Sequence, residues 1–144
     1  MSVKIIRPEV RPAVGELKKH VSELGRRFVF FDKNTFPEGN IYLIVREVLN
    51  VTEPYQSAEL RRHTVDSIML FLGKDEGLSG MLVEVEIDGK KYTLESPVAV
   101  YVPAGTWHTY RILKGSGIYM KIVFAPHGDY YPIRGLGRKT PPLP

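Results

Sequence analysis

Short β-prone segments separated by turn signals fill most of the chain from residue 27 onward, and they constrain the fold more than any other feature. Apolar and β-branched side chains gather in short runs, as strands require. Asp88-Gly89 lies between two runs and predicts a two-residue hairpin, because a type I′ turn needs positive φ at both central residues. A further turn is predicted at residues 114–117. The expected strands span residues 27–31, 41–51, 63–72, 82–87, 91–94, 99–102, 108–112 and 118–124.

One helix is expected in front of these strands, from Pro12 to Leu24. Its apolar residues recur at helical spacing, and Gly25 follows as a stop signal. The chain is therefore divided into an N-terminal helical extension (1–27), a β-domain (28–126) and a Pro/Gly-rich C-terminal tail (127–144).

Composition places the chain among ordinary globular proteins and excludes several kinds of chemistry. It has 144 residues, of which 43% are hydrophobic and 25% charged, and it contains no cysteine, so thiolate catalysis and disulfides are excluded. Apolar runs are too short for a membrane helix, and the N-terminus lacks the pattern of a signal peptide. We therefore expect a cytoplasmic protein with no membrane partner. The net charge of +4 comes from the two ends of the chain, but no nucleic-acid-binding motif accompanies it.

Two histidines, His63 and His108, lie at the heads of predicted strands and are the main candidates for a functional site. His108 follows the turn sequence Pro-Ala-Gly-Thr-Trp of residues 103–107. Side chains alternate between the faces of a strand, so Arg61, His63 and Ser67 are expected on one face and Asp66 on the other, unless a bulge turns it inward. Tyr110 shares the face of His108 and is a candidate wall of the pocket.

The spacing of these residues resembles the two sequence motifs of the cupin superfamily over residues 55–125. The second motif is matched at Pro103, Gly105 and His108, whereas its opening glycine is replaced by Pro97 and its closing asparagine by Ile112.

The first cupin motif is kept only in part. His63 matches its second histidine and Gly73 its closing glycine, but Arg61 stands at the first histidine position. The glutamate position holds Ser67 or, one residue earlier, Asp66.

The resemblance implies an all-β fold: a cupin-type antiparallel β-barrel or jelly roll, here with the N-terminal helix outside it. It also implies a homodimer, for which residues 26–50 and the C-terminal tail are the candidate interface. Cupins commonly bind one divalent metal inside the barrel, so one ion of Mn, Fe, Ni or Zn is the implied cofactor.

Three interpretations of His63 and His108 remain open at this point. They bind a metal together with a third ligand, they line a metal-free pocket in which Arg61 supplies the positive charge, or they are structural. Two histidines alone bind a metal weakly, since most catalytic sites have three protein ligands. The candidate third ligands are Glu59, Glu84, Glu86, Tyr101 and Asp66.

We therefore expect a protein that binds a small anionic or sugar-like molecule in the barrel, with a reduced metal site at His63 and His108. The other expected ligand contacts are Arg61, Ser67, Tyr110 and Asp66, and an anion suits the planar fork of Arg61. The alternative is a metal-dependent enzyme of isomerase, decarboxylase or dioxygenase type that uses both histidines as ligands.

Overall fold

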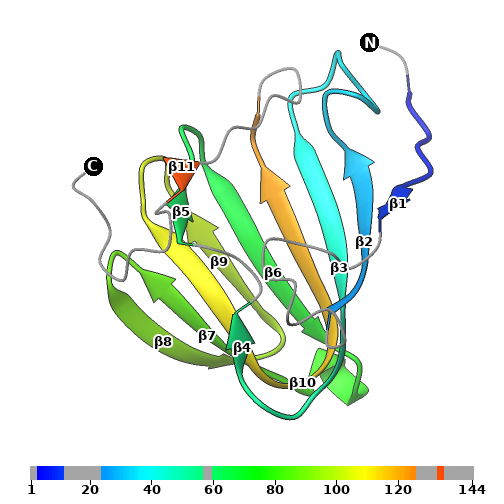
Figure 1. Cartoon of the computed structure of the whole chain (residues 1–144). Helices are drawn as coiled ribbons and strands as arrows, with labels where there is room; N and C mark the ends of the chain where they lie inside the picture. The colour runs from blue at the N-terminus through cyan, green and yellow to red at the C-terminus, as the bar shows by residue number, and fades with distance from the viewer. Residues whose placement is uncertain (1–2, 12–23, 57–59, 126–132, 135–144) are drawn as a thin grey trace.

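The chain folds into two β-sheets that share one long strand (Figure 1). The structure is a computed structural model, and it describes residues 3–11, 24–56, 60–125 and 133–134. Its strands are β1 (Glu9–Arg11), β2 (Leu24–Phe31), β3 (Tyr42–Val51), β4 (Tyr55–Gln56), β5 (Arg61–Arg62), β6 (Ser67–Gly73), β7 (Met81–Ile87), β8 (Lys90–Glu95), β9 (Val98–Val102), β10 (His108–Val123) and β11 (Ile133–Arg134). A short 3₁₀ turn follows β6 at Glu76–Leu78.

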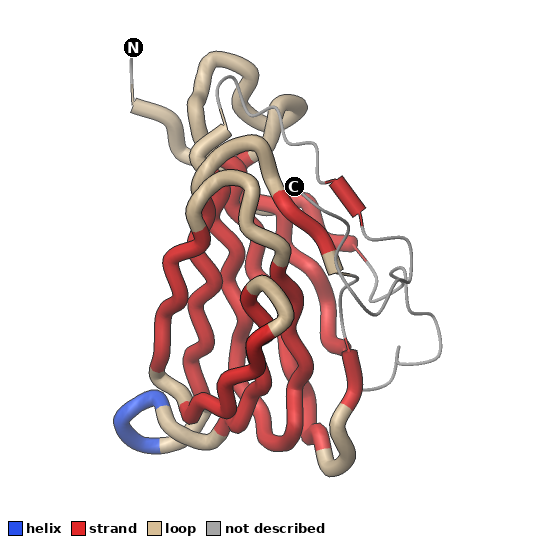
Figure 2. The backbone as a smooth tube through the Cα atoms, turned by 90° about the vertical axis from the view of Figure 1, so that its left-hand side faces the viewer, coloured by secondary structure: helices blue, strands red, loops and turns tan. Residues whose placement is uncertain are grey.

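Strand β10 belongs to both sheets because it bends halfway along its length. Its second half pairs with β3 and β6, in a sheet that β2 and β1 extend on one side and β9 on the other. Its first half pairs with β7, β4 and β5, and β8 and β11 complete that second sheet. All of these pairings are antiparallel, and Figure 2 shows the two sheets from the side.

The apolar core lies between the two sheets. Alternate residues of β6, β7 and β10 face inward, as strand geometry requires. The first sheet contributes Met69 and Phe71, and the second contributes Val83, Val85 and Ile112, each no more than 1% exposed. The inward-facing side chains of both sheets form one continuous cluster.

Several predicted strands and the hairpin are confirmed. Strands β3, β7, β8 and β9 begin and end within one residue of the predicted ranges. Asp88 and Gly89 have φ values of 46° and 84°, which is the conformation that a type I′ hairpin needs.

The turn predicted at residues 114–117 is wrong, because β10 continues through it. Gly115 and Gly117 have positive φ, and the register of β10 with β3 shifts between them, so the glycines bend the strand without reversing it. The strand predicted to start at His63 also starts later, at Ser67, after a bend that separates β5 from β6.

The two sheets do not close into a continuous barrel. Within the described residues, β1, β8, β9 and β11 each pair with a single neighbour and leave their other edge unpaired. The predicted antiparallel, two-sheet β-fold is therefore confirmed. The prediction of a closed barrel is wrong for the described residues.

The N-terminal helix is predicted for residues 12–24. Residues 12–23 of this range lie outside the described part of the chain. On both sides of that gap the chain is β-strand: Glu9–Arg11 forms β1, and β2 already starts at Leu24. The helical assignment is thus wrong at Leu24, which is the first residue of β2. No helix in the described part of the chain is long and apolar enough to span a membrane.

Candidate functional site

The two motif histidines lie against each other beside the start of β10. Their ring centroids are 4.9 Å apart at an interplanar angle of 78°, and the residues are 3% and 2% exposed. Gly105 brings them together: its φ of +81° suits glycine, and its N–H donates to the carbonyl oxygen of His63 over 2.8 Å. The predicted convergence of His63 and His108 is therefore confirmed.

Lys121 is the residue of this site that the sequence interpretation missed. Its Nζ lies 3.1 Å from Nε2 of His108, although the two residues are at opposite ends of β10. The residue is only 5% exposed, and it faces inward between Tyr119 and Val123. Lys121 lies within a strand whose neighbouring residues on both faces are apolar. This pattern was the available signal that its side chain is buried, which is rare for a lysine.

The hydrogen bonds of His108 determine which ring nitrogen carries the proton. Its Nδ1 lies 2.9 Å from the carbonyl oxygen of Thr106, which can only accept, so Nδ1 is the donor. In the neutral imidazole Nε2 therefore keeps its lone pair and accepts a hydrogen bond from Nζ of Lys121. The histidine thus orients the buried amine.

The pKa shifts show that several basic side chains lie close together in one small buried volume, where positive charge is disfavoured. Burial and the charge of Lys121 lower the pKa of His63 to about 2 and that of His108 to about 3. The pKa of Lys121 is itself lowered well below its ordinary value, first by burial and then by the charge of Arg61. Arg61 is the register partner of His108, so both side chains lie on the same face.

Ser67 and Tyr110 are also placed on the inner side, as predicted. Ser67 is fully buried, and its Oγ has no hydrogen-bond partner. It lies opposite Val123, one inward-facing position along from Lys121. The ring of Tyr110 packs against those of Tyr119 and Phe71, with centroid distances of 4.3 and 5.4 Å. These three rings form an aromatic cluster between the sheets, called the floor below.

Asp66 does not join the cluster. Its carboxylate accepts hydrogen bonds from the hydroxyl of Tyr101 and from the N–H of Ala104, the latter over 2.8 Å. Both contacts lie on the exposed side of the strands, so the regular alternation of side chains prevails over the bulge that would have turned Asp66 inward. Its role here is to attach the loop before His108 to the sheet.

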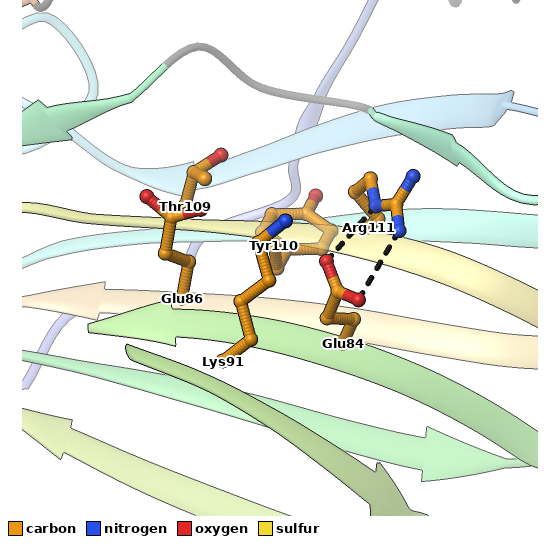
Figure 3. Close-up of a pocket in the computed structure, with 6 residues that line it drawn as sticks. All are labelled: Glu84, Glu86, Lys91, Thr109, Tyr110 and Arg111. Carbon is orange, nitrogen blue, oxygen red and sulfur yellow. Dashed lines mark hydrogen bonds and ion pairs between the residues drawn. The ribbon is translucent and has the colours of Figure 1, made fainter. Parts of the chain in front are cut away.

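The remaining candidate carboxylates are on the outer surface or outside the described residues. Glu84 makes a two-pronged ion pair with Arg111, both contacts being 3.1 Å, on the solvent face of the second sheet. Figure 3 shows the residues that line a pocket there: Glu84, Glu86, Lys91, Thr109, Tyr110 and Arg111. Glu59 lies outside the described residues.

The inner cluster does not fit a divalent metal. Within the described residues no group of three or more His, Asp or Glu side chains could hold an ion. The lone pair that His108 would offer to a metal accepts from Lys121 instead, and Arg61 adds a permanent positive charge beside it.

Comparison with known proteins identifies the fold. No protein-family model matches the chain, and no curated protein matches it. Among solved structures it is similar to a cupin 2 domain-containing protein from Halorhodospira halophila, with 19% identity and a TM-score of 0.54 over 76% of this chain and 68% of that one.

Two other solved structures extend the likeness to proteins of different kinds. PAC13 from Streptomyces, solved with uridine, is 9% identical over 93% of each chain with a TM-score of 0.55. The FeII form of HppE is 12% identical over 84% of this chain and 60% of that one, with a TM-score of 0.53. The protein described here has the cupin fold.

Proposed function

We propose that the cluster of Arg61, His63, Ser67, His108 and Lys121 binds a small anionic molecule through a carboxylate or phosphate group. The observation that carries this proposal is the buried Lys121–His108 contact, in which a hydrogen-bond donor occupies the Nε2 lone pair that a metal would need. Several basic side chains are costly to bury together unless an anion compensates their positive charge.

The groups that shift the pKa values of His63, His108 and Lys121 include no acidic side chain. Lys121 and Arg61 are the charges that lower the pKa of both histidines. The unpartnered Oγ of Ser67 adds a neutral donor that needs an acceptor. A bound oxyanion would accept from Lys121, Arg61 and Ser67, and the water-excluding interior would strengthen each bond.

The fold supports this role without specifying the ligand. PAC13, which shares the fold, was solved with the small molecule uridine. A neutral nucleoside gives little reason for a buried lysine and arginine, so for this chain we place the anionic group first and leave the remainder of the ligand open.

Thermal unfolding with small anions tests the proposal. Acetate, pyruvate, malonate and inorganic phosphate serve as probes, with acetamide and pyruvamide as neutral counterparts of the first two. We expect at least one anion to raise Tm in a saturable way and its neutral counterpart to have no effect. Lys121→Met should abolish the shift, whereas Lys114→Met, an exposed lysine on the same strand, should keep it.

A metal-dependent enzyme is the alternative, because the FeII form of HppE has a similar fold. Elemental analysis of the protein after incubation with Mn, Fe, Ni or Zn decides between the two. Stoichiometric metal that is lost in His108→Ala would contradict the anion proposal. Wild-type protein that stays metal-free while it responds to anions would support it.

A further inference from the structure

Three arginines occupy matching positions on three neighbouring strands. Arg11 is the register partner of Arg27, and Arg27 is the register partner of Arg46. Cross-strand partners present their side chains to the same face of a sheet. That face is the inner one, because Arg46 alternates along β3 with Ile44 and Val48, which are 4% and 2% exposed.

Only the outer end of this row has an acidic partner among the described residues. Arg11 pairs with Glu9 at 3.1 Å on the exposed edge strand. Arg27 and Arg46 make no ion pair within the described part of the chain, and the Nε atom of each is buried without a hydrogen-bond partner. Like charges directly opposite each other destabilise a sheet, and a buried donor without an acceptor adds to that cost.

The arginine pair lies next to the Lys121 cluster. Arg27 donates through Nη2 to the hydroxyl of Tyr42, which faces inward two positions before Ile44 on β3. Ile44 is the register partner of Lys121. The guanidinium of Arg27 therefore extends across the row that contains Lys121, and Arg46 is the diagonal neighbour of Lys121 on the same face.

We infer that Arg27 and Arg46, together with Tyr42, form a second anion subsite beside the Lys121 cluster. The inference rests on the proposed function and deepens it: the ligand carries two anionic groups, one for each cluster. Short dicarboxylates and phosphorylated or phosphonated carboxylic acids have this chemistry. Arginine suits such a subsite because its planar fork binds an oxyanion through two parallel hydrogen bonds.

Isothermal titration with matched dianions and monoanions tests the second subsite. The probes are malonate, succinate and glutarate, each against its monomethyl ester, and phosphonoacetate against its carboxylate methyl ester. Charge-assisted hydrogen bonds in a buried site predict that the dianion of suitable length binds about 10- to 100-fold more tightly than its ester. Which series gives the larger ratio distinguishes a second carboxylate from a phosphonate.

Three variants locate the effect. Arg46→Met should reduce the dianion-to-ester ratio to about one and leave the Kd of the ester within about threefold, since Lys121 still binds the remaining anionic group. Arg26→Met, at an exposed arginine of the same strand as Arg27, controls for the loss of one charge and should keep the ratio. Lys121→Met should abolish binding of dianion and ester alike.

The outcomes separate this inference from the proposed function. If wild-type protein binds dianion and ester equally well, or if Arg46→Met weakens both equally, the second subsite is wrong and the anion site at Lys121 stands. If no anion binds, both are wrong. Arg27→Met serves as the second variant should Arg46→Met fail to fold. A purely structural arginine pair predicts that either variant lowers the Tm of the ligand-free protein, whereas a ligand subsite predicts an equal or higher Tm.

Discussion

The contact between Lys121 and His108 determines the chemistry of the buried cluster. Nδ1 of His108 is committed to the carbonyl of Thr106, and Nε2 accepts from Lys121. An imidazole with both nitrogens engaged in this way positions an amine and has no lone pair left for an ion. Arg61 adds a permanent positive charge to the same cluster.

Replacement of Lys121 by methionine should stabilise the ligand-free protein. The side chains have similar volumes, and the buried amine has no acidic partner among the described residues, so we expect the free energy of unfolding to rise by about 1–3 kcal/mol. Urea denaturation at pH 7 measures this change. Lys114→Met, on the exposed side of the strand, should change stability by less than about 0.5 kcal/mol. A clear loss of stability in Lys121→Met would show that the amine serves the fold.

Sequence reasoning could place individual residues only where a local pattern applied. It predicted the convergence of His63 and His108 and the inward position of Ser67, and strand alternation correctly put Asp66 on the other face. It missed Lys121, because a lysine within a strand is normally assigned to the solvent face. No local sequence pattern indicates that its side chain meets His108.

Strand β10 is the element on which the site depends. It supplies His108 at its start and Lys121 near its end, and the side chains of the two residues are in contact. Figure 1 shows the bend of β10 between its two halves. Gly115 and Gly117 make the bend possible. Both have positive φ, and a Cβ at Gly115 would collide with the carbonyl oxygen of Gly80, the residue before β7.

Substitution of Gly115 by alanine should therefore be among the most damaging single changes in the chain. Left-handed strain and the backbone collision together predict a loss of about 2–4 kcal/mol in the free energy of unfolding. Gly77→Ala is the matched control: it also has positive φ, at 71°, but a Cβ there meets nothing within 4 Å. It should cost about 1 kcal/mol. Chemical denaturation compares the two, and equal losses would show that the bend does not need a glycine.

At the scale of the whole molecule, the two sheets enclose a polar cluster within an apolar core. Apolar side chains from both sheets fill one continuous region, and the floor of Phe71, Tyr110 and Tyr119 adjoins the polar groups. Burial in this core is the main cause of the low pKa values of His63 and His108. The stability of the fold is therefore coupled to pH.

The ligand-free protein should lose stability as pH falls below 6.5. In the unfolded chain His63 and His108 take up protons near pH 6.5, whereas in the folded protein their pKa values are about 2 and about 3. Unfolding thus binds protons between these values, and stability rises with pH by up to about 1.4 kcal/mol per pH unit for each histidine. Urea denaturation between pH 5 and about 6.5 tests this slope.

His108→Gln is the control for the pH prediction, since it should lower the slope over the same interval by the contribution of His108, up to about 1.4 kcal/mol per pH unit. A stability that is flat between pH 5 and 6.5 in the wild type would mean that the histidines are not buried as described. A bound anion should reduce the slope, because it favours the protonated forms of the same groups.

The sequence alone determined the local features of this protein: the positions of most strands, the type I′ hairpin at Asp88-Gly89, and His108 at the head of a strand. These features depend on residue type and on a period of two, which act over a few neighbouring residues. The tertiary structure decided that Lys121 meets His108 and that Arg27 and Arg46 face the same interior. Those contacts depend on which strands pair and where β10 bends, and such pairing joins residues far apart in the chain.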